Sequence, residues 1–398
     1  MQINIENSGP DKRSESKKPS AWMLLIAAAY IAAASAYIPY ILFGDLLISY
    51  PYETSMFAIM APAAGIGVCM LLSSSPKSVV PFCIISGVIM FMGISVPLSS
   101  VICVFIALVC VSAFVIREGY WWIVAIPNAV SFGALLLLTR ELALPILSLA
   151  YIPVAITLFF TFRKKKQRVP SIASLSACMG LVIAALLVIS VYNTYGALSE
   201  ASFKEFFDTL RTDITSRTLE ALNLAIDELD SIISKADVTD LVNTTISLTF
   251  NLLPAIIAIF LFVISYITHS LYVSLLATRV EDKSEIINAV TFNMSTVSAF
   301  VFLLAYIFSL VLANEGLELY SVAAQNVYTM LLPGFTMITF GFVGSIVRSK
   351  KASCLGTLLY IGMFAMLFFM TGVALILASF AGSVIVILTA IKSKKDNK

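Results

Sequence analysis

The chain has 398 residues, of which 60% are hydrophobic and 12% are charged, and its formal net charge is +2. This much apolar surface excludes a water-soluble globular domain, and so small a net charge argues against nucleic acid as a partner. The apolar residues form runs of about 20, the length that an α-helix needs to cross a bilayer. We therefore expect an all-α, polytopic integral membrane helical bundle in contact with lipid.

Residues 1–20 form a polar tail that carries Lys12, Arg13, Lys17 and Lys18. The apolar run that follows exceeds the roughly 7–15 residues of the apolar region in a cleavable signal sequence. We therefore expect a retained first membrane helix behind a cytoplasmic tail.

Small residues line one face of this first helix, where Ala28, Ala32 and Ala36 recur every four residues. Such a strip lets another helix approach closely. Two interpretations are open. The strip packs against the protein's own helices, or it docks a partner membrane protein.

Polar breaks divide the apolar sequence into twelve expected spans, or eleven if the last two form one kinked helix. The spans are residues 22–43, 55–74, 79–95, 97–116, 120–139, 143–162, 171–192, 247–276, 291–313, 324–347, 354–374 and 377–391. With a cytoplasmic N-terminus, 20 of the 25 Lys and Arg residues fall on cytoplasmic segments. This asymmetry follows the positive-inside rule and predicts that both termini are cytoplasmic.

A basic run from Arg163 to Arg168 separates a first six-helix membrane block, residues 21–168, from a second block, residues 169–398. Basic residues beside a membrane set its topology and attract anionic lipid at about 1 kcal/mol each. The run is therefore interpreted as a topology determinant, with docking of a cytoplasmic partner as the alternative.

The second block contains an external segment, residues 193–245, that is acidic and free of proline. Apolar residues recur there at helical spacing in two stripes: Phe203, Phe206, Phe207, Leu210 and Ile214, then Leu219, Leu222, Ile226, Leu229 and Ile233. The spacing predicts amphipathic helices. We favour a helical lid or hairpin packed on the bundle. Insertion into the outer membrane interface and binding of another protein remain open.

Motifs for catalysis and for ATP hydrolysis are missing from the sequence. The single histidine, His269, excludes the paired histidines of an HExxH zinc site, and no GxxxxGK(S/T) phosphate loop is present. The six cysteines lie in or beside apolar runs without a CxxC pair, which indicates reduced packing residues. We expect no enzymatic activity, no cofactor and no metal, and any ATP-driven work requires a partner ATPase.

Three polar residues within predicted spans are candidates for a ligand pocket: Asn128, Asn251 and His269. Asn128 follows Pro127 and Asn251 precedes Pro254, and a proline in a span frees backbone groups that transporters use to hold polar substrates. The alternative for Asn128 and His269 is an interhelical hydrogen bond worth about 0.6 kcal/mol. The sequence does not identify the small-molecule ligand.

The layout of the chain resembles the YybS-like family of predicted bacterial membrane proteins. The resemblance rests on the apolar N-terminal block, the insert at residues 193–245, the Asn251-Leu252-Leu253-Pro254 span, and the Gly/Ala-rich final spans before a basic tail. That family is similar to the substrate-binding membrane components of energy-coupling-factor vitamin transporters. The resemblance implies docking on a shared energising module through a small-residue face such as Ala28 and Ala32.

These observations favour a transport-related, substrate-binding component of the cell membrane without its own ATPase. The first alternative is a structural or regulatory cell-envelope protein that binds partners through its acidic external helices or its basic cytoplasmic loops. The second alternative is a secondary carrier, which the central basic loop between two six-helix halves fits.

Overall fold

The computed structural model describes residues 19–43, 51–73, 80–91, 96–140, 143–164, 167–227, 235–276, 292–348, 362 and 371–396. Within these residues all regular structure is helical, which confirms the expected all-α class. The helices are α1 (Ala21–Phe43), α2 (Pro51–Leu72), α3 (Val80–Phe91), α4 (Val96–Arg117), α5 (Trp122–Thr139), α6 (Ala143–Ser148), α7 (Ile152–Arg163), α8 (Arg168–Tyr195), α9 (Glu200–Asp227), α10 (Lys235–Asn251), α11 (Leu253–Leu276), α13 (Thr296–Asn314), α14 (Glu318–Arg348) and α16 (Thr371–Asp396).

Nine helical segments in the described part of the chain are long and apolar enough to cross a membrane. They are Ala21–Pro39, Ser99–Arg117, Trp122–Thr139, Leu144–Arg163, Arg168–Tyr195, Leu253–Leu276, Thr296–Asn314, Glu318–Ile346 and Gly372–Lys392. α2 adds a shorter apolar stretch, Ile59–Leu72. The tail at 1–18 and most of the expected span at 354–374 lie outside the described residues. The polytopic membrane architecture is confirmed, whereas the count of twelve spans and the orientation of the termini remain predictions.

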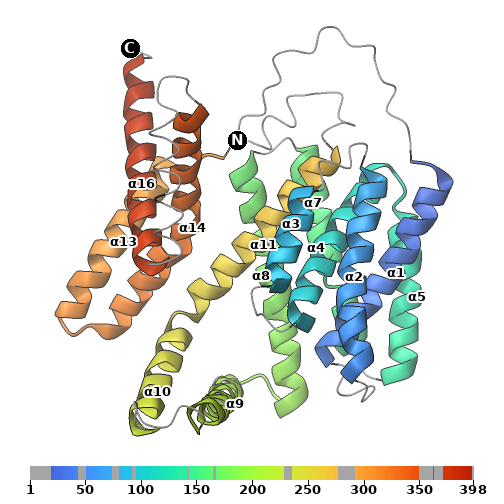
Figure 1. Cartoon of the computed structure of the whole chain (residues 1–398), viewed down its shortest axis with the longest axis horizontal. Coiled ribbons are helices and arrows are strands. Elements are labelled where there is room, and N and C mark those ends of the chain that lie inside the picture. The colour runs from blue at the N-terminus through green and yellow to red at the C-terminus, as the bar shows by residue number, and fades with distance from the viewer. Residues whose placement is uncertain are drawn as a thin grey trace. The chain divides into compact units, whose positions relative to one another are not determined.

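The chain forms two compact units, whose helices are drawn in Figure 1. Among the described residues, the first unit contains α1 to α7, α8 up to Leu186, and α11 from Leu261 onward. The second unit contains the remaining parts of α8 and α11 together with α9, α10, α13, α14 and α16. The first unit thus extends beyond residue 168, and the expected division into two six-helix blocks at that position remains a prediction.

The core of the first unit surrounds α4. Every side chain from Ser99 to Val115 except Phe105 is buried, because α1, α2 and α7 pack around this helix. Glycine permits part of this close packing: a Cβ on Gly65 of α2 would lie 2.9 Å from the Cβ of Ala107 on α4. A helix that is apolar all round is expected to be buried on all sides, and α4 is such a helix.

The second unit is held together by α13, α14 and α16, which pack against one another. α16 meets α14 through small and hydroxyl side chains, with Ser379 Oγ 2.9 Å from Thr336 Oγ1. Gly382 lies so close to α14 that a Cβ there would collide with the Phe335 carbonyl. A cluster of aromatic rings joins all three helices: Phe302, Tyr306, Tyr328, Phe335 and Phe380. Small residues at a helix interface are the usual means of close packing in membranes.

The predicted insert at residues 193–245 is helical where it is described, apart from residues 196–199 between α8 and α9. α9 is a continuous helix of 28 residues, and Arg211 on it donates to Ser247 Oγ of α10 at 2.6 Å. Figure 1 shows α9 nearly end-on, whereas α10 is seen from the side. Two residues of the first apolar stripe, Leu210 and Ile214, remain 38% and 39% exposed. The packed lid therefore remains a prediction.

Because α9 is one continuous helix, its pitch fixes the directions in which the two predicted apolar stripes face. The last residue of the first stripe, Ile214, and the first residue of the second, Leu219, are five residues apart, which turns an α-helix by roughly 140°. The two stripes therefore face different directions on one helix. Leu229 and Ile233, the end of the second stripe, lie outside the described residues.

Candidate functional site

Two of the three predicted polar candidates lie in the first unit and are buried. Asn128 is 3% exposed and His269 is 0% exposed. Asn251 belongs to the second unit, and its side chain is exposed. Each of the three has its own neighbours among the described residues.

Asn128 joins two helices of the first unit. It follows Pro127 on α5, and its Nδ2 donates to the Val124 carbonyl at 2.7 Å and to the hydroxyl of Tyr151, just before α7. Its Oδ1 is buried and accepts no hydrogen bond from the described residues. The interhelical hydrogen bond considered as the alternative is therefore present, while a ligand role for Asn128 remains a prediction.

His269 lies on α11, seven residues before this helix ends at Leu276. Its ring packs against the Phe162 ring of α7, with centroids 5.2 Å apart and an interplanar angle of 33°. Neither Nδ1 nor Nε2 has a hydrogen-bond partner among the described residues. An imidazole in its neutral form carries one donor and one acceptor. The fold thus buries this side chain without using either group.

A cation lies beside this imidazole. Arg168 begins α8, and its guanidinium carbon lies 4.3 Å from the centroid of the Tyr266 ring. Arg168 Nη2 also donates to Ser270 Oγ at 2.5 Å. Both contacts are with α11, and the guanidinium is near enough to His269 to interact with it electrostatically. Arg168, the last residue of the predicted basic run, is therefore fixed on α11.

We call Phe162, Arg168, Tyr266, His269 and Ser270 the α8–α11 cluster. Sequence reasoning found His269 but missed the other four members. Tyr266 lies three residues before His269 and four before Ser270, so the helical pitch gives a signal for Tyr266 beside each of them, whereas Ser270, one residue after His269, does not share its face. The pitch of one helix gives no signal for Phe162 and Arg168, because their contacts join α7 and α8 to α11.

The α8–α11 cluster has the chemistry of a binding site for a polar group. It offers a buried donor and acceptor from the imidazole and a fixed positive charge from Arg168, while the Ser270 hydroxyl accepts from Arg168 and donates to the Tyr266 carbonyl. In the part of the chain that the structure describes, no group of three or more His, Cys, Asp or Glu side chains is placed to hold a metal ion. The five cysteines described there are all free.

Asn251 marks a break between α10 and α11, and Asn326 of α14 bridges it. Pro254 has no backbone N–H and interrupts the helical hydrogen bonds there. Asn326 Nδ2 donates to the Asn251 carbonyl at 2.9 Å, and Asn326 Oδ1 accepts from the Ala255 N–H at 3.0 Å. The side-chain amide of Asn326 thus replaces the missing bond between residues 255 and 251. Sequence reasoning did not single out Asn326.

The small-residue strip on α1 is half-buried. Ala28 packs against the core of the first unit, and the Ala32 carbonyl accepts a hydrogen bond from Ser131 of α5 at 3.1 Å. Ala36 is also half-buried, whereas Ala29 and Ala33 on the adjacent face are exposed. The intramolecular contacts of Ala28 and Ala32 are therefore present. Partner docking through this strip remains a prediction.

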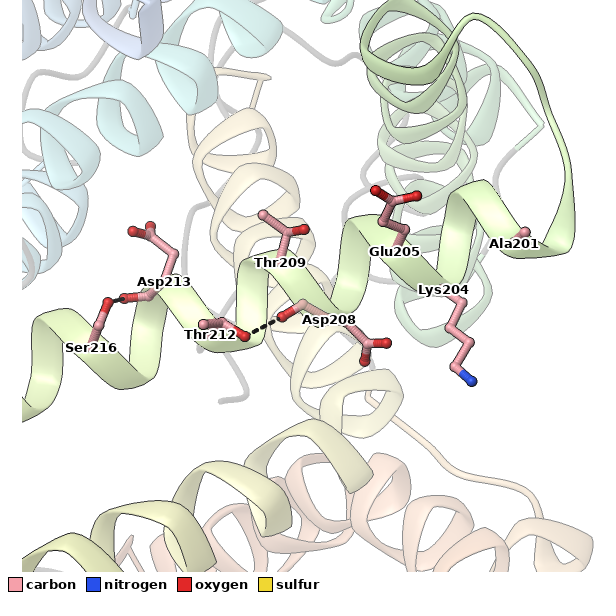
Figure 2. Close-up of a pocket in the computed structure, with 8 residues that line it drawn as sticks. All are labelled: Ala201, Lys204, Glu205, Asp208, Thr209, Thr212, Asp213 and Ser216. Atoms are coloured by element: carbon pink, nitrogen blue, oxygen red, sulfur yellow. Dashed lines mark hydrogen bonds between the residues drawn. The ribbon is translucent and has the colours of Figure 1, made fainter.

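A shallow groove runs along α9, and Figure 2 shows its lining. The lining residues are Ala201, Lys204, Glu205, Asp208, Thr209, Thr212, Asp213 and Ser216. All of them come from one side of a single helix, and the carboxylates of Glu205, Asp208 and Asp213 do not converge on a common point. This polar face lies opposite the first apolar stripe, so the groove is a solvated helix surface.

The chain was compared with known families, curated proteins and solved structures. A family model described as "Predicted membrane protein (DUF2232)" matches residues 84–382, which is more than half of the chain. The chain belongs to this family. No curated protein and no solved structure matches. The matched region contains the whole α8–α11 cluster.

Proposed function

We propose that this member of the DUF2232 family of predicted membrane proteins is a transport-related component that binds a small polar ligand and lacks its own ATPase. The observation that carries the proposal is His269, which is fully buried and has no hydrogen-bond partner among the described residues. An unsatisfied buried polar group costs about 1–3 kcal/mol, which phenylalanine or leucine would avoid. A ligand that engages the imidazole accounts for its presence.

The position of His269 supports a functional role. α11 is a candidate membrane span, and an ionisable residue within such a span is by default a functional-site hypothesis. The polar neighbours of His269 are not its hydrogen-bond partners, because Arg168 is bonded to Ser270 and stacked on Tyr266. The polar groups around the ring are thus held in place while its own nitrogens remain available.

We infer binding rather than catalysis at this cluster. The cluster lacks a carboxylate or thiol to work beside His269, and a guanidinium stays charged and cannot exchange a proton. A neutral imidazole with a fixed cation nearby is suited to recognising a polar group. We therefore propose that the protein is not an enzyme and needs no cofactor.

The proposed orientation places both termini in the cytoplasm, and 20 of the 25 basic residues support it. In that orientation the C-terminal end of α11 and the start of α8 face the cytoplasm. The sequence has no phosphate loop, so energy for transport would come from a partner ATPase. The Ala28, Ala32 and Ala36 strip is the proposed docking face for such a partner.

The test compares the purified wild-type protein with His269→Phe, using Thr268→Val as the control. Thr268 is the adjacent buried residue, and its hydroxyl donates to the Ile264 carbonyl one turn earlier on α11, at 2.7 Å. Untargeted mass spectrometry measures the small molecules that each protein retains. We expect a compound that the wild type and Thr268→Val retain and that His269→Phe loses.

His269→Phe should also remain folded, because it keeps the ring contact with Phe162 and removes an unsatisfied polar group. Its melting temperature without ligand should equal or exceed that of the wild type, because the cost of burying an unsatisfied imidazole is removed. Failure of the wild type to retain any compound, or equal retention by His269→Phe, overturns the proposal.

A second candidate function is a structural or regulatory protein of the cell envelope. The observation that favours it is the exposure of Leu210 and Ile214 on α9, on the face opposite the acidic groove. Purification in mild detergent separates the two candidates. A stable ATPase partner supports the transport role, whereas recovery of an envelope or division protein that is lost in Ile214→Glu supports the envelope role.

A further inference from the structure

Arg168 is the charged member of the α8–α11 cluster, and its position limits what the cluster can bind. Its guanidinium is held by two contacts with α11, the stack on Tyr266 and the hydrogen bond to Ser270. The side chain is half-buried, so its charge is only partly screened by solvent. A fixed charge beside a buried, unsatisfied imidazole selects ligands by the sign of their charge.

Resting on the proposed function, we infer that the α8–α11 cluster binds an anionic group, a carboxylate or a phosphate. Arg168 supplies the opposite charge, and its planar guanidinium matches the geometry of both groups. The His269 ring, with one N–H in its neutral form, donates a hydrogen bond to a ligand oxygen. The Ser270 hydroxyl holds Arg168 in place through the hydrogen bond that it accepts.

The N-terminal end of α8 strengthens this inference. Arg168 is the first residue of α8, and the backbone N–H groups at the start of a helix carry partial positive charge that favours anions. The unsatisfied and fully buried His269 is an independent observation that points to a ligand near the Arg168 side chain. A cationic ligand would meet repulsion from both Arg168 and the helix end.

The same anionic chemistry has two sources: a soluble anion from the cytoplasm, or the phosphate of an anionic lipid headgroup. The start of α8 follows Arg163, the last residue of α7, and Lys164, which both sources can reach. Two arms of one experiment distinguish them. One arm supplies inorganic phosphate to protein in lipid without net charge, and the other supplies anionic lipid without free phosphate.

For the first arm, the full chain is placed in phosphatidylcholine nanodiscs, and binding of inorganic phosphate is measured at constant ionic strength by calorimetry and by melting temperature. Arg168→Gln removes the charge, and Arg163→Gln removes an exposed charge from the end of α7 as the matched control. We expect phosphate to raise the melting temperature of the wild type and of Arg163→Gln. Arg168→Gln should bind phosphate at least about tenfold more weakly, since a hydrogen bond to a charged group is lost.

For the second arm, native mass spectrometry counts the lipids retained from nanodiscs that contain phosphatidylglycerol. Retention by the wild type and by Arg163→Gln, with loss in Arg168→Gln, assigns the anion to a lipid headgroup. If Arg168→Gln does not fold, Ser270→Ala is used, which removes one contact that holds the guanidinium and should weaken binding in whichever arm is positive. Equal binding by all variants, or no binding in either arm, overturns the inference.

The outcomes also separate this inference from the proposed function. A neutral or cationic compound that is lost in His269→Phe, with both anion arms negative, leaves the ligand-binding function in place and overturns the anionic class. Anionic lipid bound through Arg168, with no small molecule retained by the wild type, supports the anion site and overturns the transport proposal.

Discussion

The two units hold their membrane helices together in different ways. In the most apolar stretch of α4, the central helix of the first unit, 89% of the residues are buried, against 22% in α13 of the second unit. α4 has protein on all sides, whereas only a third or less of the most apolar stretch is buried in each of α13, α14 and α16. The first unit encloses the imidazole of His269, whereas the buried polar side chains of the second unit, among the described residues, are all serine or threonine.

The energetic consequence follows from the reference state of a membrane protein. Apolar side chains gain little on moving from lipid to protein, so close contacts and hydrogen bonds decide stability. In the first unit such contacts are spread around α4. In the second they are concentrated where α16 approaches α14 and where Asn326 bridges a broken helix. Single substitutions should thus have larger effects in the second unit.

Gly382→Ala should have the largest effect. Its new Cβ would lie 2.8 Å from the Phe335 carbonyl carbon and would collide with the carbonyl oxygen, and a backbone cannot move aside as a flexible side chain does. α16 must therefore move away from α14, which should lower the free energy of unfolding by about 3 kcal/mol. Melting in detergent measures it.

Gly341→Ala is the control, because it adds the same atom within α14 at a position with nothing within 4 Å. Equal melting temperatures for the two variants would show that α14 and α16 do not rely on this approach. The expectation that single substitutions have larger effects in the second unit would then be wrong.

Asn326→Leu should have the next effect. It removes the amide that bridges the break, so the Asn251 carbonyl and the Ala255 N–H lose their partner. The expected cost is about 2 kcal/mol, mainly from the N–H of Ala255, a buried residue, because the hydrogen bond to the Asn251 carbonyl is exposed. Asn243→Leu, an exposed asparagine on α10, should leave the melting temperature unchanged. Hydrogen exchange should show faster exchange at Ala255 in Asn326→Leu alone, and protection equal to the wild type would contradict the bridging role.

The sequence predicts the helical membrane class because apolar runs of about 20 residues have the length and composition that a membrane-spanning helix needs. It also predicts helix in the insert, since residues at spacings of three and four lie on one face. It does not show that the insert's two stripes diverge on a continuous α9, because this depends on whether residues between Ile214 and Leu219 break the helix. The local sequence pattern predicts which residues share a face of one helix. It does not predict which other helices pack against that face.

The same limit applies to the candidate site. His269 stands out as a lone histidine in an apolar run, and Asn128 stands out beside Pro127. Arg168 lies in a basic run, where loop charge is the ordinary interpretation, and only the packing of α8 on α11 shows its contacts with Tyr266 and Ser270. Asn326 is one of several polar residues on α14, and its role depends on a break 75 residues away.

Tyr151→Phe should have the smallest effect, because it removes one hydrogen bond from the enclosed first unit. Asn128 Nδ2 keeps its bond to the Val124 carbonyl at 2.7 Å, and the phenylalanine ring fills the same space. Interhelical hydrogen bonds in membranes average about 0.6 kcal/mol, so the melting temperature should fall by roughly 1–2 °C. Tyr192→Phe, 55% exposed on α8, is the control and should not change it. Ligand retention should equal that of the wild type if Asn128 only joins α5 to α7. A loss of the retained compound in Tyr151→Phe, at an unchanged melting temperature, would instead make Asn128 part of the ligand site and extend that site from α11 to α5.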